Sequence, residues 1–182
     1  MTAIDRVRAL RRVATAIGMT AMLAACSSAP LDTYDLTAPK GTVGGHGGGP
    51  QVVVADPVVD RALDTDRIVV RPAGNEIAYF AGAQWSDRLP RLLQSRLVET
   101  LEASGRFRAA GRPGQGMAAD RQIVMEIRAF DYLPAEGRVR VVIAAKLMDD
   151  RSGRIAASRL FEAAEPVAGD GAAAVKIGTA HV

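Results

Sequence analysis

Five leucines recur on one face of a helix that we predict over residues 86–104, and no other feature restricts the fold as strongly. They are Leu89, Leu92, Leu93, Leu97 and Leu101. Their spacing follows the helical repeat and forms one continuous apolar stripe. The opposite side carries polar residues that we expect to face solvent, namely Arg88, Arg91, Gln94, Glu99 and Glu102. A helix with one apolar face has to pack on a second apolar surface.

The ends of this predicted helix carry residues typical of helix termini. Ser86 or Asp87 is expected to cap the first turn, which also tolerates Pro90, and Gly105 suits the left-handed position after the last turn. Trp85 directly precedes the helix. It is a candidate partner-binding residue, because tryptophan is frequent at interface hot spots. Its position beside the stripe favours the alternative, in which the indole caps the core.

The rest of the chain has the alternation and the turn residues of β-structure. We predict strands over 51–55, 67–71 and 76–80, then a meander of three strands over 122–132, 138–149 and 154–165. Residues 31–36 are expected to pair as a short edge strand. Two strands of the meander share one apolar face: Ile123, Met125, Ile127, Val139, Val141, Ile143, Ala145 and Leu147. The predicted fold class is therefore α+β, a two-layer domain with a mostly antiparallel sheet and one main amphipathic helix packed on it.

The N-terminus has the pattern of a bacterial lipoprotein signal. Four arginines precede a short apolar run, which ends in the lipobox Leu23, Ala24, Ala25 and Cys26. The run is too short for a membrane span, which needs about 20 apolar residues. Cys26 is the single cysteine, so we expect it to be acylated rather than to form an internal disulfide. Ser27 follows it, and the absence of Asp there favours the outer membrane, with the domain facing the periplasm.

Three regions are predicted. Residues 1–25 are the signal peptide, 26–50 an acylated tether rich in glycine and proline, and 51–182 one folded domain. A weak helix is expected over 171–177 after Asp170, which either docks as a short stub or belongs to a domain that is truncated at its C-terminus. Without residues 1–25 the chain has 19 basic and 19 acidic residues. We therefore expect no nucleic-acid partner, since such binding needs a basic surface.

The sequence lacks the residue clusters of common active sites, so we expect no enzyme, no cofactor and no metal. The two histidines, His46 and His181, lie in the glycine tract and next to the last residue, where neither has a partner for a nucleophile or a metal. A membrane-anchored periplasmic hydrolase is a lesser alternative. It would need Asp131 with Glu126 or Glu136 as a carboxylate pair.

The segment 84–94, with Trp85 and the start of the leucine stripe, resembles the ABC-type transport auxiliary lipoprotein family. Residues 34–36, 101–107 and 127–131 add to the resemblance, which extends from Cys26 to about Pro166. It implies a non-enzymatic outer-membrane lipoprotein that works with an MCE-domain protein and an ABC transporter in intermembrane lipid transport. It also implies a homo-oligomer. The other alternative is a structural cell-envelope lipoprotein that binds peptidoglycan or an assembly complex.

Overall fold

The computed structural model describes residues 30–38 and 48–167. The lipobox, Cys26, most of the glycine tract and the helix predicted after Asp170 lie outside these residues. The described strands are β1 (Asp32–Tyr34), β2 (Gln51–Val54), β3 (Val58–Val59), β4 (Arg67–Val70), β5 (Ala78–Trp85), β6 (Ala109–Gly111), β7 (Arg121–Leu133), β8 (Arg138–Asp149) and β9 (Ile155–Pro166). The helix α2 spans Leu89–Ala103. The α+β class, with one helix on a sheet, is confirmed for this part of the chain.

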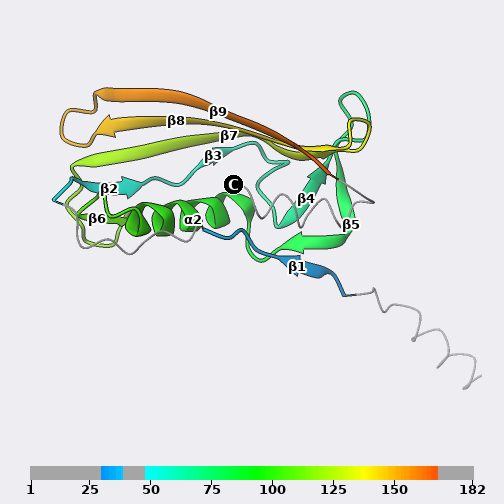
Figure 1. Ribbon diagram of the computed structural model, residues 1–182, viewed down its shortest axis with the longest axis horizontal. Helices are drawn as coiled ribbons and strands as arrows, with labels where there is room; N and C mark the ends of the chain where they lie inside the picture. The colour runs from blue at the N-terminus through cyan, green and yellow to red at the C-terminus, as the bar shows by residue number, and fades with distance from the viewer. Residues whose placement is uncertain (1–29, 39–47, 168–182) are drawn as a thin grey trace, which may run out of the picture. The chain divides into compact units, whose positions relative to one another are not determined.

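Within the described residues, the strands form one mixed sheet around β7 (Figure 1). β8 pairs antiparallel with β7, and β9 pairs antiparallel with β8. On its other side β7 has three short parallel neighbours in succession, β2, β3 and β4. The prediction of a mostly antiparallel sheet therefore holds only for the meander and for the β4–β5 hairpin. The parallel pairs arise because α2 lies in the chain between β2–β4 and β7, and a helical crossover connects parallel strands.

The register of β7 and β8 confirms the predicted apolar face over its first half. Ile123 lies opposite Leu147, and Ile127 lies opposite Ile143. A bulge between Ile127 and Ala129 then adds one residue to β7, so that Phe130 pairs with Val141. One extra residue exchanges the two faces of a strand. Phe130 consequently joins the core instead of the solvent face, and Asp131 turns away from that core face.

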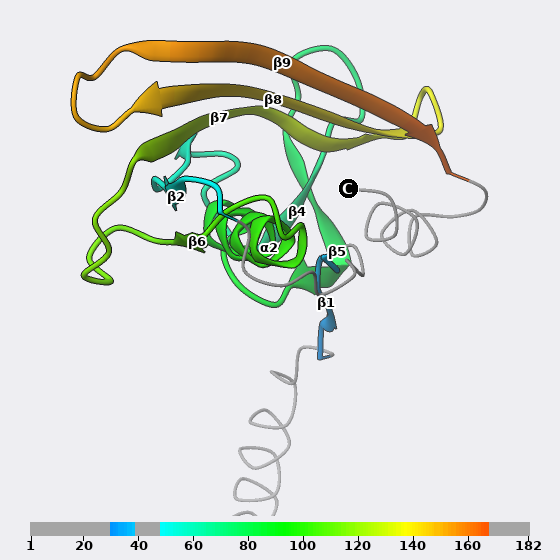
Figure 2. The same cartoon turned by 60° about the vertical axis from the view of Figure 1, so that its left-hand side comes forward.

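The long strands β7, β8 and β9 arch over α2, with β9 at the outer edge (Figure 2). Leu89, Leu92 and Leu93 are buried in the core that α2 shares with the sheet. Trp85 belongs to the same core, and its ring meets Phe130 edge to face at 5.6 Å between centroids. The predicted β1 edge strand is confirmed as a parallel neighbour of β5.

Three predictions for the ends and faces of α2 have different outcomes. Gly105 has a φ of +63°, as its C-terminal position requires. The predicted cap by Ser86 or Asp87 is wrong: the N-cap is Arg88, without a side-chain cap, and Asp87 accepts from the Arg88 amide instead. The solvent-facing position of Gln94 is also wrong. Its amide is buried and donates to the Val54 carbonyl and to Asp56 Oδ1, both at 2.9 Å.

Candidate functional site

The segment over residues 31–38, which follows the predicted anchor and its first tether residues, is built into the domain beside α2. β1 aligns Tyr34 with Trp85, and the Ser86 amide donates to the Tyr34 carbonyl at 2.7 Å. Leu36, two residues on, is 3 % exposed and packs in the main core. A chain entering the fold through a paired strand and a buried leucine is held at a defined place. We call residues 31–38 the docked segment.

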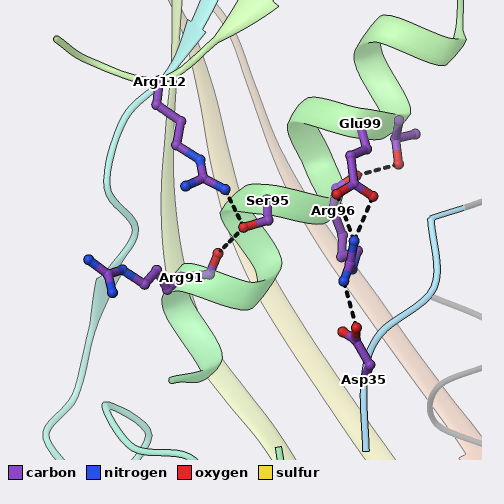
Figure 3. A network of polar contacts seen from close by, with 7 residues as sticks. Asp35, Arg91, Ser95, Arg96, Glu99 and Arg112 are labelled. Atoms are coloured by element: carbon purple, nitrogen blue, oxygen red, sulfur yellow. Dashed lines mark hydrogen bonds and ion pairs between the residues drawn. The ribbon is translucent and has the colours of Figure 1, made fainter. Parts of the chain in front are cut away.

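An ion-pair network joins the docked segment to the middle of α2 (Figure 3). Arg96 Nη2 donates to Asp35 Oδ2 at 2.7 Å, and Arg96 Nη1 donates to Glu99 at 2.6 Å. The hydrogen bond from Arg96 lowers the pKa of Asp35 below its ordinary value of 3.8, and Asp35 in turn raises the pKa of Arg96. The Asp35 side chain is half exposed, so this pair orients the segment more than it stabilises it.

A second contact in the same view fixes the other side of α2. Arg112, just after β6, donates to Ser95 Oγ, and Ser95 Oγ donates to the Arg91 carbonyl at 2.8 Å (Figure 3). The helix is therefore attached both to the docked segment and to the chain after β6. The two contacts thus hold α2 from two sides, one through Arg96 and one through Ser95.

An apolar groove of about 800 Å³ lies between α2 and the strands β7, β8 and β9. Its lining includes Leu97 of the predicted stripe together with Ile123, Met125, Val141, Ile143, Ala145, Phe161 and Ala163. A smaller cavity of about 220 Å³, which reaches Leu36 of the docked segment, shares Leu97, Met125 and Ile143 with it. The Arg159 guanidinium lies over the Phe161 ring, 4.9 Å from its centroid, at the β9 side. The groove thus offers apolar surface with one cation beside it.

The carboxylate of Asp131 is bound by two guanidiniums on the other face of the sheet. Arg71 Nε donates to Oδ2 at 2.6 Å, while Arg140 donates to Oδ1 at 3.1 Å and to Oδ2 at 2.9 Å. Asp131 is buried, whereas both arginines reach solvent. The hydrogen bond to Asp131 raises the pKa of Arg140. Both carboxylate oxygens are thereby occupied, and the cluster ties β4, β7 and β8 together.

The structure describes some of the predicted site residues and not others. Leu23, Ala24, Ala25 and Cys26 lie outside the described residues and remain predictions. Trp85 is 4 % exposed and edge-on to Phe130, so in this structure it offers a partner almost no surface. Glu126 is exposed and pairs with Arg128 at 2.9 Å, which lowers the pKa of Glu126. Asp131 and Glu126 therefore each have an arginine partner.

Sequence reasoning missed the Asp35–Arg96 pair and the guanidinium partners of Asp131. Arg71 is 60 residues from Asp131, and Arg96 is 61 residues from Asp35. Residue spacing within one helix or strand cannot predict pairs that are so far apart in the chain. The available signal was an aspartate in an otherwise apolar part of a strand, because a buried carboxylate needs a partner.

The described residues contain no group of three or more metal-ligating side chains. Among those same residues, no helix combines the length and the hydropathy that crossing a bilayer requires. What the described part offers is therefore a docked segment, an apolar groove and an open sheet edge.

The described residues thus form an α+β domain with the docked segment held beside α2. The family model of the ABC-type transport auxiliary lipoprotein component matches residues 34–178. The chain belongs to this family. The match begins at Tyr34, inside the docked segment, and includes every element from β2 to β9.

Individual relatives agree with this assignment. An uncharacterized protein of Bradyrhizobium diazoefficiens is 30% identical over 141 residues, which are 73% of this chain and 36% of that protein. The chain thus spans about a third of the length of this curated relative. Protein XCC0632 of Xanthomonas campestris is 26% identical, with a TM-score of 0.69 over 81% of this chain and 85% of that one. A crystal structure of another uncharacterized protein shares the fold, with a TM-score of 0.64, 17% identity and coverages of 83% and 90%.

Proposed function

We propose that this chain is a non-enzymatic, acyl-anchored auxiliary component of an ABC/MCE-type system that moves lipids between the two membranes. The observation that carries the proposal is the family match from Tyr34 onwards, which starts within the segment that the domain holds in place. In the proposed arrangement Cys26 carries the acyl chains, the tether supplies reach, and the docked segment connects the tether to α2. The domain faces the periplasm from the outer membrane.

The docked segment supports this role because it is integral to the domain. Leu36 is buried in the core and Asp35 is paired with Arg96, so the connection to the tether cannot slide along the surface without losing core contacts. An auxiliary component that holds its domain near a membrane needs such a fixed point of attachment. Acyl chains on Cys26 would provide the membrane side, since each buried methylene contributes about 0.8 kcal/mol.

Partner capture tests the transport role. The full-length chain, tagged at its C-terminus and purified from its own membranes, should bring with it an MCE-domain protein and subunits of an ABC transporter. The matched control is Cys26→Ser, which keeps the folded domain but removes the proposed acyl site. Co-purification of peptidoglycan or of an envelope assembly complex, without any transporter subunit, would favour the structural alternative and contradict the proposal.

The hydrolase alternative is tested by turnover. Both oxygens of Asp131 accept from guanidiniums and Glu126 pairs with Arg128, so neither carboxylate is placed as a free acid or base. We expect no hydrolysis of an ester and glycoside panel by the full chain. Turnover that is lost in Glu126→Gln or Asp131→Asn protein, with the fold retained, would overturn the non-enzymatic role.

A further inference from the structure

The apolar groove between α2 and the strands β7, β8 and β9 continues into the smaller cavity beside Leu36. The two spaces, of about 800 Å³ and about 220 Å³, share Leu97, Met125 and Ile143 in their lining. Pockets of about 300–1,000 Å³ are large enough to bury most of a small organic ligand. The groove therefore has room for a ligand that starts at β9 and passes along the groove face of β8 and β7 towards the docked segment.

The side chains on the groove face of β8 and β9 favour a hydrocarbon ligand. Ile143 lies opposite Phe161, Val141 lies opposite Ala163, and all four line the groove. Glu162, which also belongs to the lining, stands between Phe161 and Ala163 on β9, so its side chain turns to the other face of the sheet. A lining of this kind would leave the polar groups of a peptide unpaired, at a cost in free energy. A hydrocarbon chain has no such groups.

The rim of the groove at β9 combines exposed apolar surface with one cation. Phe161 and Leu160 are 48 % and 46 % exposed, and such surface beside a groove is typical of a binding site. Arg159 stands on the same face of β9 as Phe161, with its guanidinium 4.9 Å from the centroid of that ring. Among residues 30–38 and 48–167, Arg159 takes part in no ion pair. Its guanidinium can therefore bind a carboxylate or phosphate whose attached chain enters the groove.

We propose that the groove binds one acyl chain of an anionic membrane lipid, with the headgroup at Arg159. The chain passes Phe161 and runs between α2 and the sheet towards the cavity beside Leu36. This inference rests on the proposed function, because it names lipid as a molecule that this chain itself holds within the transport system. The lipid comes from the bilayer, since the proposed function keeps the acyl chains of Cys26 in the membrane.

Binding of palmitoyl lysophosphatidylglycerol, which has one acyl chain and a negative charge, tests the groove. The full chain carrying Cys26→Ser, which has no acyl chains of its own, is titrated below the micellar concentration of the lipid and followed by native mass spectrometry. We expect saturable binding of one molecule per chain. Ala163→Trp, which adds an indole to the groove lining, should weaken this binding about tenfold or more. The matched control is Ala164→Trp, on the other face of the same exposed strand and opposite Arg140, and should bind as before.

The position of the headgroup is tested with two lipids that share the same acyl chain. Arg159→Gln should weaken the binding of palmitoyl lysophosphatidylglycerol about two- to fivefold, the range of an exposed ion pair. It should leave the binding of palmitoyl lysophosphatidylcholine, which has no net charge, unchanged. The matched control is Arg151→Gln, an exposed arginine of the β8–β9 turn, which should change neither. Equal losses for the two lipids would overturn the headgroup position.

Two results would overturn the groove as the lipid site. One is the absence of saturable binding to the Cys26→Ser chain, in which case residues 168–182, which follow β9, are the occupant to test. The other is equal binding by Ala163→Trp and its parent. Should Ala163→Trp fail to fold, Ala145→Phe on the groove face of β8 replaces it.

These titrations use the purified chain alone, so they are independent of the partner capture that tests the transport role. Failure of lipid binding, with transporter subunits still co-purifying, contradicts the groove assignment and leaves the transport role in place. Lipid binding without any transporter subunit supports the groove assignment and contradicts the transport role.

Discussion

Asp35 and Arg96 form a 2.7 Å ion pair between the docked segment and the centre of helix α2, although 61 residues separate them in the chain. The pair places the point where the tether enters the fold beside the helix that supports the sheet. Glu99 holds the same guanidinium from the next turn of α2. The position of the docked segment is thereby coupled to the orientation of one arginine.

Replacing Asp35 with Asn should weaken this coupling only modestly. The pair is half exposed at Asp35, so we expect a loss of about 0.2–1 kcal/mol in the free energy of unfolding at neutral pH. Because the pKa of Asp35 is lowered in the folded chain, its contribution is complete above 3.8 and disappears as the pH falls through the folded value. Urea unfolding of both proteins from pH 7 to pH 2 measures this difference.

The control for that experiment is Asp32→Asn, an exposed aspartate in β1 without an ion pair among the described residues. It should leave the unfolding curve unchanged. A difference between wild type and Asp35→Asn that does not shrink as the pH falls below 3.8 would contradict a role for the Asp35 charge.

Removing the Asp131 carboxylate should be far more costly. Asp131→Asn removes the negative charge and one of the two acceptor oxygens that Arg71 and Arg140 share, and the breaking of a buried pair costs about 3–5 kcal/mol. We expect the lower end of that range, because both guanidiniums reach solvent. Thermal unfolding gives the loss, and Glu126→Gln, whose pair is fully on the surface, is the matched control. Equal effects of the two changes would mean that burial of Asp131 contributes nothing.

The leucine stripe can be tested at one buried and one half-buried position. Leu93→Ala removes a buried side chain from the main core and should cost roughly 2–5 kcal/mol. Leu101→Ala, at a half-buried position of the last turn, should cost clearly less. Chemical denaturation of both variants measures the ratio. A change of under about half a kcal/mol at Leu93 would place the stripe in solvent.

Gln94 offers a further test of the α2 contact. Its amide donates to the Val54 carbonyl and to Asp56. In Gln94→Glu protein a carboxylate oxygen, which cannot donate, would face these two acceptors. Leaving such a buried group unpaired costs about 1–3 kcal/mol at neutral pH. The loss should shrink at acidic pH, where a protonated glutamate can donate again. Stability that is unchanged at neutral pH would show that this amide does not hold α2 to β2.

The sequence predicts those parts of this fold that depend on local spacing. The leucine stripe located α2, and alternation located β7 and β8 together with the apolar face that Ile123 and Leu147 share. The bulge before Ala129 escaped prediction, because nothing in the residues from Ile127 to Phe130 marks an extra residue. Gln94 was misplaced for a related reason: its acceptor on Val54 lies 40 residues away, and helical periodicity alone counts any polar residue as exposed.

The residues of the candidate site were likewise predictable only where their signal is local in the sequence. The lipobox is a local signal and needs no tertiary structure. Arg96, by contrast, meets Asp35 because the docked segment lies beside α2, and Arg71 meets Asp131 through the parallel β4–β7 pair. No short window of sequence contains either contact. The order of strands beside β7 depends on the crossover through α2. Within residues 30–38 and 48–167, the exposed edge at β9 likewise becomes visible only once its pairing with β8 is known.

The most direct test of the proposed account is intact-mass and peptide mass spectrometry of the mature chain purified from its own membranes. We predict an N-terminus at Cys26 that carries acyl chains, with residues 1–25 absent. An unmodified N-terminus at any other residue would contradict the acyl anchor, and with it the proposal that this domain works from a membrane.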